Sequence, residues 1–145
     1  MESFGRGRPL PEEEAGSCVF PVVLVSLFWG GLSMLLYSEP FMPGVYPLSD
    51  LGVPHTVSGI PSPWSCAAFD ICLVLDSVLS AFVGSRLLIP VKGIRRTVMG
   101  VSLLAAAAGF LLAIAPHNAL PGTHAVGSGL AFGGWWLLDR KSVVE

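Results

Sequence analysis

The side chains that could do chemistry in this sequence are three histidines and a few aspartates, and most of them fall in or near its loops. Imidazole and carboxylate groups are good zinc ligands, and three protein ligands plus a water form the usual catalytic zinc site. Asp50, His55, His117 and His124 could supply such a set. No His-x-x-x-His or Cys-x-x-Cys spacing occurs, and the Pro-Gly pair at 121–122 interrupts any single helix between the last two histidines. We therefore expect no bound metal or other cofactor, and a structural or proton-responsive role for His124.

Two further aspartates, Asp70 and Asp76, lie inside a long apolar run. A carboxylate within a membrane span is costly and marks a functional hypothesis by default. The two are six residues apart, which is roughly 240° around an α-helix, so they do not share a face and do not form a catalytic pair. Asp76 lies deeper in the run. It could hold helices together through serines such as Ser26, Ser33 or Ser102, line a proton or ion pathway, or contact a substrate.

Four apolar runs must position these groups. Hydrophobic residues make up 52% of the 145 residues and charged residues only 12%, about half the share typical of soluble domains. A run of about twenty residues forms a helix roughly 30 Å long, which matches the hydrocarbon core of a bilayer. The sequence therefore predicts an all-α transmembrane bundle with four spans, at about 18–37, 65–89, 97–115 and 121–138.

The basic residues all fall on one side of this predicted bundle. All eight lie before the first run, beside the loop between the second and third runs, or after the fourth. The positive-inside rule therefore places both termini in the cytoplasm, with residues 1–17 as a disordered tail. The three histidines fall on the outer side, together with the loop 38–64. That loop is rich in Pro and Gly yet contains apolar side chains, so we expect a packed or re-entrant cap.

The predicted partners follow from charge and from small residues. A net charge of −2 and a pI of about 5.9 disfavour nucleic-acid binding, which leaves the lipid bilayer as the main partner. Gly129 and Gly133 form a GxxxG pair, and Ala105 and Gly109 share the same spacing. Because such residues let membrane helices approach closely, we expect close packing of the third and fourth helices, and a homo-oligomer through Gly129 and Gly133 is possible on this pattern.

Residues 46–127 carry two motifs in a distinctive order. The stretch PLSDLG at 47–52 follows the first run, and an Ala-Pro turn at 115–116 precedes His124 and several small residues. In this the sequence resembles a family of multi-pass membrane proteins named domain of unknown function 998. The resemblance implies a six-helix bundle of unsettled activity. It also points to four positions worth testing: Ser49, Asp50, Gly52 and His124.

Only four apolar runs are present, so this resemblance implies that two helices are missing at the C-terminal end. Residues 139–145 look like a translated sequencing-adapter read-through. We therefore expect a non-native tail there, with two further spans following Leu138 in the natural protein.

The function expected from these observations is that of a multi-pass integral protein of the cell membrane, in a structural, sensing or lipid-interacting role rather than as an enzyme. Two alternatives stay open. One is a proton-coupled transporter or carrier that uses Asp76. The other is an intramembrane metal-dependent hydrolase that uses the outer-face His and Asp residues. The candidate functional residues are Ser49, Asp50, Gly52, Asp70, Asp76 and His124.

Overall fold

A computed structural model describes residues 12–88, 94–116 and 118–142 of the chain, and the side chains of 20–88, 97–116 and 118–136. These residues form an all-helical structure without strands. Its elements are α1 (Glu12–Leu35), the short 3-10 helix η2 (Leu48–Gly52), α2 (Pro63–Leu87), α3 (Ile94–Ala113) and α4 (Pro121–Ser142).

The helix bounds differ from the predicted ones mainly at the two polar ends. α1 begins at Glu12, so residues 12–17 are helical and do not belong to the disordered tail that we expected. The sequence there opens with three glutamates, which are good helix formers and suit the positive end of the helix dipole. α4 likewise continues past Leu138 to Ser142, into the segment predicted as a separate tail.

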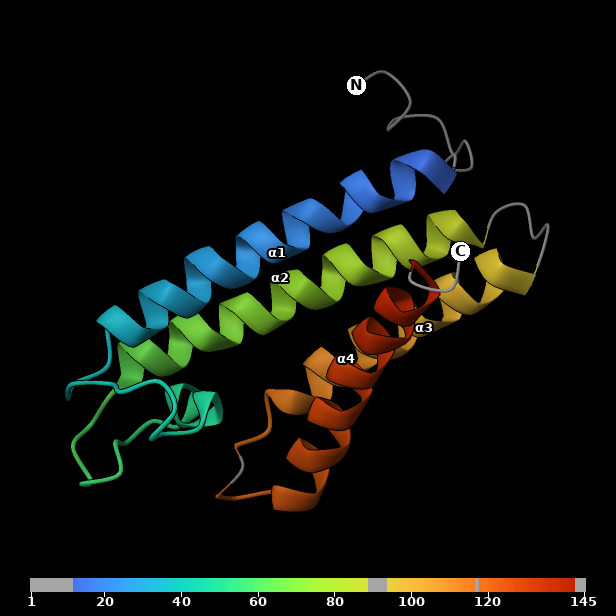
Figure 1. Ribbon diagram of the computed structural model, residues 1–145. Helices are drawn as coiled ribbons and strands as arrows, with labels where there is room; N and C mark the ends of the chain where they lie inside the picture. Colours follow the sequence, from blue (N-terminus) through green and yellow to red (C-terminus); the bar gives the residue numbers. More distant parts are fainter. Residues whose placement is uncertain (1–11, 89–93, 117, 143–145) are drawn as a thin grey trace.

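The helices pack in chain order, with α1 on α2, α2 on α3 and α3 on α4 (Figure 1). Successive helices alternate in direction. The start of α1, the end of α2, the start of α3 and the end of α4 therefore lie at one end of the molecule. The connection between α1 and α2, residues 36–62, forms a folded segment at the opposite end, which we call the cap. Its only regular element is η2, which packs on α2.

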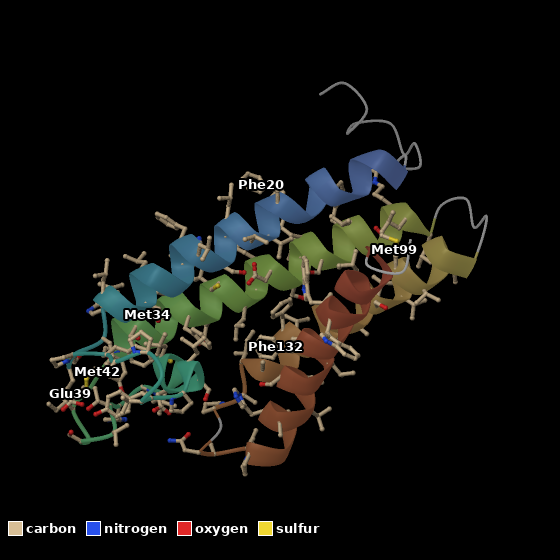
Figure 2. All side chains as sticks on the ribbon, viewed as in Figure 1. Phe20, Met34, Glu39, Met42, Met99 and Phe132 are labelled. Carbon is tan, nitrogen blue, oxygen red and sulfur yellow. The ribbon has the colours of Figure 1, made fainter. Side chains whose placement is uncertain are left out.

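The bundle exposes many large apolar side chains and also buries several polar ones. Phe20 is among the exposed residues and projects away from the other helices (Figure 2). Beside a majority of hydrophobic residues, the buried positions of the helices include Ser33, Ser65, Asp76, Ser77, Ser80 and Ser102. A small apolar cluster of Val83, Leu87 and Leu103 packs with partly buried neighbours near the C-terminal end of α2. In soluble proteins, by contrast, the side chains of serine and aspartate are mostly exposed.

Among the described residues one helix, the 25-residue α2, is long and apolar enough to cross a membrane by length and composition. Shorter apolar stretches cover Phe20–Leu35 in α1 and Thr97–Ala113 in α3. The all-helical class is thus confirmed, together with one candidate membrane span.

The predicted close packing of α3 against α4 is confirmed, and it depends on three glycines. A Cβ atom on Gly109 would lie 2.6 Å from the carbonyl oxygen of Gly127, and one on Gly127 would lie 2.5 Å from the amide nitrogen of Ala113. A Cβ on Gly134 would lie 2.5 Å from the carbonyl oxygen of Ser102. The two backbones therefore touch where no side chain separates them.

Gly129 and Gly133 take no part in this contact, although they form the GxxxG pair in the sequence. A Cβ built on either would meet nothing within 4 Å. Gly129 follows Gly127 by two residues, roughly 200° around the helix, so it faces away from α3. The pair thus does not join α3 to α4, and its predicted role in a homo-oligomer stays a prediction.

Candidate functional site

The deepest candidate residue, Asp76, lies at the interface between α1 and α2. It is only 2% exposed. The hydroxyl of Ser26 in α1 donates a hydrogen bond of 2.7 Å to its Oδ2 atom, and the Cys72 thiol lies 3.6 Å from the same oxygen. The other carboxyl oxygen, Oδ1, is buried and has no hydrogen-bond partner within the described ranges. The prediction that a serine such as Ser26 holds Asp76 is confirmed.

Three other buried serines, Ser33, Ser65 and Ser77, link helices without Asp76. The Ser33 hydroxyl in α1 donates to the carbonyl oxygen of Ser65 at 2.9 Å, and Ser65 Oγ donates to the carbonyl oxygen of Leu51 in η2 at 3.2 Å. Ser77 donates to the carbonyl oxygen of Ala107, which joins α2 to α3. Hydroxyl groups therefore connect α1, η2, α2 and α3 in sequence.

The PLSDLG motif forms η2, which is wedged against the first turns of α2. Asp50 and Gly52 are buried, whereas Ser49 is partly exposed. A Cβ atom on Gly52 would lie 2.8 Å from Cδ1 of Phe69, and the Gly52 carbonyl oxygen accepts a hydrogen bond from the Cys66 thiol. The glycine thus permits η2 to approach α2 closely, which is a packing reason for its presence in the motif.

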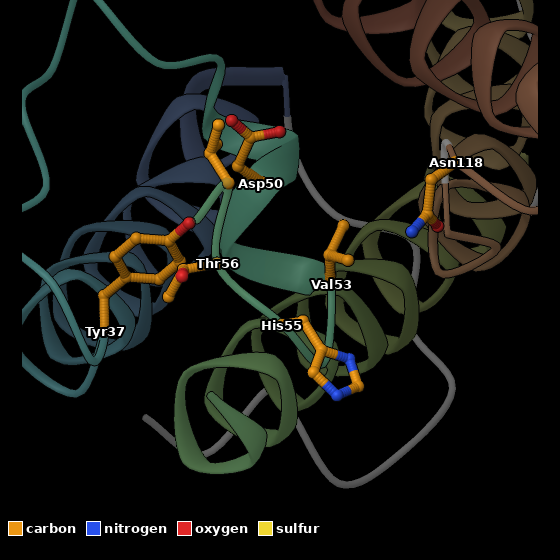
Figure 3. Close-up of a pocket in the computed structure, with 7 residues that line it drawn as sticks. Tyr37, Asp50, Val53, His55, Thr56 and Asn118 are labelled. Atoms are coloured by element: carbon orange, nitrogen blue, oxygen red, sulfur yellow. The ribbon is translucent and has the colours of Figure 1, made fainter. Parts of the chain in front are cut away.

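A cavity of about 170 Å³ lies between the cap and the turn that joins α3 to α4 (Figure 3). Five residues with polar side chains line it, namely Tyr37, Asp50, His55, Thr56 and Asn118, together with Val53 and Val57. We call this cavity the cap pocket. In Figure 3, Tyr37, Thr56 and Asp50 lie on one side of it and Asn118 lies across from them.

Of the five polar residues that line the cap pocket, Asp50 and His55 were singled out by the sequence, and three were not. Tyr37 ends the first apolar run, where an aromatic residue is usually assigned to the membrane interface. Thr56 and Asn118 are ordinary loop residues. Only the fold of the cap and the position of the α3–α4 turn bring these three together.

Tyr37 is one of three buried polar residues of the cap pocket, together with Asp50 and Thr56. Its side chain is 7% exposed, and its hydroxyl makes no hydrogen bond of normal geometry within the part of the chain that is described. Burial raises the pKa of the phenol, the nearby backbone of Val57 lowers it, and the negative charges of Asp50 and Glu39 raise it further. The raised pKa favours the protonated form of the hydroxyl.

The cap itself is held by a dense set of hydrogen bonds. Thr56 and Ile60 exchange hydrogen bonds across a turn at Gly59, whose φ of +84° suits glycine. The Ser38 hydroxyl donates to the carbonyl oxygen of Pro61 at 2.7 Å. Glu39 accepts hydrogen bonds from the side chains of Thr56 and Ser58, which hold the pKa of its carboxyl below the ordinary value. The cap is thus a folded unit, as predicted.

His124, in the first turns of α4, closes the end of α3. Its Nδ1 atom lies 3.0 Å from the carbonyl oxygens of both Ala113 and Ala115. Because both partners only accept, Nδ1 carries the proton, and Nε2 is left to face the hydroxyl of Ser128 at 3.4 Å. The side chain satisfies carbonyls that the end of a helix leaves open, which is the structural one of the two roles that we expected, and the proton-responsive role stays a prediction.

Asp70 lies on the cap half of α2 and is half-buried. Its nearest polar neighbour is the Cys66 thiol, 3.9 Å from Oδ2, and Oδ1 is buried without a hydrogen-bond partner in the described segments. Cys66 and Cys72 are both free thiols. Asp70 and Asp76 have separate surroundings, in agreement with their spacing.

No group of three His, Cys, Asp or Glu side chains that could hold a metal ion occurs among the described residues. Asp50 and His55 both line the cap pocket, whereas the imidazole of His124 is occupied at the end of α3. His117 lies outside the described residues. The hydrolase alternative therefore gains no support from the geometry.

Comparison with family models, with curated proteins and with solved structures gives no match for this chain. The resemblance to the domain of unknown function 998 family accordingly depends on the two motifs alone and stays a prediction.

Proposed function

We propose that this protein is a multi-pass membrane protein with four spans, α1 to α4, and that it acts as a sensing or lipid-interacting component rather than as an enzyme. The observation that carries the proposal is the large number of exposed apolar side chains, combined with polar side chains buried between the helices. Phe20, Leu27, Phe28, Val78 and Phe132 are all more than half exposed, while Asp76 and several serines are buried between the helices. Exposed apolar patches of this kind mark contact with a membrane or a partner, and buried hydrogen bonds between helices are typical of membrane bundles.

The sensing role draws support from the connection between the cap and the helices. Six of the seven residues that line the cap pocket belong to the cap. Ser65 of α2 donates a hydrogen bond to Leu51 of the cap and accepts one from Ser33 of α1, so it links the cap to both helices. Occupation of the pocket would therefore bear on the position of two helices at once. In the proposed orientation the pocket faces outward, and the basic end of the bundle faces the cytoplasm.

Cysteine labelling tests this topology. Single cysteines at Ser58, which is exposed in the cap, and at Lys92, between α2 and α3, are introduced into a variant that lacks the three native cysteines. In intact cells a membrane-impermeant maleimide should modify Ser58→Cys, and Lys92→Cys should react only after the membrane is permeabilised. Modification of Lys92→Cys from outside would overturn the orientation. Release of the protein by alkaline carbonate would overturn membrane integration.

A proton-coupled carrier is a second candidate, because Asp76 Oδ1 is buried without a hydrogen-bond partner in the described structure. Such an oxygen could take up and release a proton during transport. In reconstituted vesicles with an internal pH dye, Asp76→Asn should abolish a pH-dependent proton flux, and Asp70→Asn should leave it intact. Equal flux in wild type and Asp76→Asn would exclude this role.

A further inference from the structure

The Ser26 hydroxyl lies within hydrogen-bonding distance of two acceptor oxygens at the α1–α2 interface. The carbonyl oxygen of Val22, one turn earlier in α1, is 3.0 Å from Ser26 Oγ, and Asp76 Oδ2 is 2.7 Å from it. Serines inside helices often donate to the carbonyl oxygen four residues earlier. Because a hydroxyl has a single proton, Ser26 cannot fully satisfy both oxygens.

A proton on Asp76 would supply the missing donor. When the carboxyl group is ionised, Ser26 is the donor to Oδ2, and its contact with Val22 is left without a proton. When Oδ2 carries a proton, Asp76 donates to Ser26 Oγ, and Ser26 donates to the carbonyl oxygen of Val22. Donor and acceptor are exchanged between the two forms while every heavy atom stays in place. Only the protonated form places a proton in both contacts.

The surroundings of the carboxyl group also favour the neutral form. Oδ1 is buried and has no hydrogen-bond partner within the described residues. The thiol of Cys72, 3.6 Å from Oδ2, is only a weak donor. Buried charges are normally paired, because removing them from water is costly. An unpartnered oxygen therefore costs less on a neutral acid than on a carboxylate.

No cation near Asp76 is supplied by the described side chains that surround α2. Residues 20–35 of α1 and 97–113 of α3 contain no titratable side chain, and η2 contributes a further acid, Asp50. The other titratable side chains of α2 are those of Cys66, Asp70, Cys72 and Arg86. Arg86, the one cation among them, is ten residues from Asp76, which is about 15 Å along the helix.

We infer that Asp76 and Ser26 form a proton-binding site inside the bundle, in which Oδ2 holds the proton and shares it with Ser26 Oγ. Asp76 is 2% exposed, so the site has no room for a larger ligand. The proton then belongs to the contact between α1 and α2, and its loss would leave a charge between the two helices. This inference goes beyond the proposed function, because it holds whether or not protons cross the membrane.

Infrared spectroscopy of the full chain tests this assignment. The protein is labelled with 13C at the side-chain carboxyl of aspartate and purified at neutral pH in a detergent without carbonyl groups. Wild type should show a carbonyl stretch of a protonated carboxyl group that is missing from Asp76→Asn and present in Asp70→Asn. Ser26→Ala should shift the frequency of this band, because the acid loses its hydrogen-bond partner.

Ser80→Ala is the matched control for Ser26→Ala. Ser80 follows Asp76 by one turn on the same side of α2, is fully buried, and its hydroxyl has no hydrogen-bond partner in the described part of the chain. Removal of this hydroxyl should leave the band at its wild-type frequency.

Two outcomes would overturn the inference. One is that Asp76→Asn loses only a carboxylate band, which would show that Asp76 is ionised. The other is a protonated band with the same frequency in wild type and Ser26→Ala, which would show that the proton is not shared with the serine. The second comparison remains decisive even if Asp76→Asn fails to fold. Neither depends on the cysteine labelling or on proton flux, so a failure here is distinct from a failure of the proposed function.

Discussion

Ser26 of α1 and Asp76 of α2 meet across the helix interface, where the serine hydroxyl donates a hydrogen bond of 2.7 Å to the carboxyl oxygen Oδ2. The carboxyl is almost fully enclosed by protein. In surroundings without water, a polar group of this kind depends on a partner from a neighbouring helix. The pair thus fixes α1 against α2 at one defined position, and this makes it measurable.

A double-mutant cycle on this pair should show coupling. We expect Ser26→Ala and Asp76→Ala, separately and together, to give a coupling energy of about 0.6–1.7 kcal/mol in the free energy of unfolding, measured by detergent-driven denaturation. Ser85→Ala is a suitable control, because the Ser85 hydroxyl is exposed and donates to Phe82 of its own helix. That variant should stay within about 0.5 kcal/mol of wild type. Zero coupling between Ser26 and Asp76 would contradict the assigned hydrogen bond.

Glycine substitutions in α3 and α4 should have opposite signs. Gly109→Ala places a methyl group within 3 Å of the backbone of α4, so the helices must separate, and a loss of roughly 1–3 kcal/mol in the free energy of unfolding is expected. Gly129→Ala meets nothing within 4 Å and should be neutral or stabilising by up to about 1 kcal/mol through helix propensity. Comparable losses at both positions would show that Gly129 also lies in a helix contact.

The glycine of the PLSDLG motif should prove to be a packing residue. Gly52→Ala brings a methyl group to 2.8 Å from Phe69, and we expect a lower melting temperature, equivalent to about 1–3 kcal/mol. The double variant Gly52→Ala/Phe69→Leu should recover part of that loss, because the smaller side chain gives way. Thermal melting of the three proteins in one detergent decides the point, and a double variant less stable than either single one would refute the packing account.

The cap should loosen under mild acid. The folded-state pKa of Glu39 lies below its ordinary value of 4.5 because Thr56 and Ser58 donate hydrogen bonds to the carboxylate. A carboxyl group whose pKa is lower in the folded state than in the unfolded state stabilises the fold at any pH above its unfolded-state pKa. This contribution disappears as the pH falls through its folded-state pKa. The difference in melting temperature between wild type and Glu39→Gln should therefore be largest above about pH 5 and shrink toward about pH 3. A difference that stays constant over this range would argue against these hydrogen bonds.

Much of the helical architecture follows from the sequence, because long apolar runs with most of their charges between them leave few other folds. The positions at which the helices begin and end in polar sequence were harder to predict. Hydropathy detects the apolar part of a helix, whereas α1 begins at Glu12 with glutamates that favour helix without being apolar. The Ser26–Asp76 contact could be predicted, because a carboxylate in an apolar run needs a hydrogen-bond partner and the neighbouring runs contain serines as polar residues.

The site at the cap could be predicted only in part. Asp50 and His55 could be selected by their residue types. Tyr37 and Asn118 lie far apart in the sequence, and only the fold brings them to the same pocket. The glycines of α4 show the same limit. Gly and Ala residues are spread around α4, so no periodic pattern in the sequence identifies the face that packs on α3. The GxxxG spacing therefore indicated the wrong pair for this contact.

The chain-order packing of α1 to α4 has a consequence for biosynthesis. Each helix finds its main partner in the segment made immediately before or after it, so a stable hairpin can close as soon as its second helix leaves the ribosome. Contacts that are local in sequence also form quickly. Such a chain can be inserted as two successive hairpins, α1 with α2 and then α3 with α4. No helix then depends for its main contact on a segment that is synthesised much later.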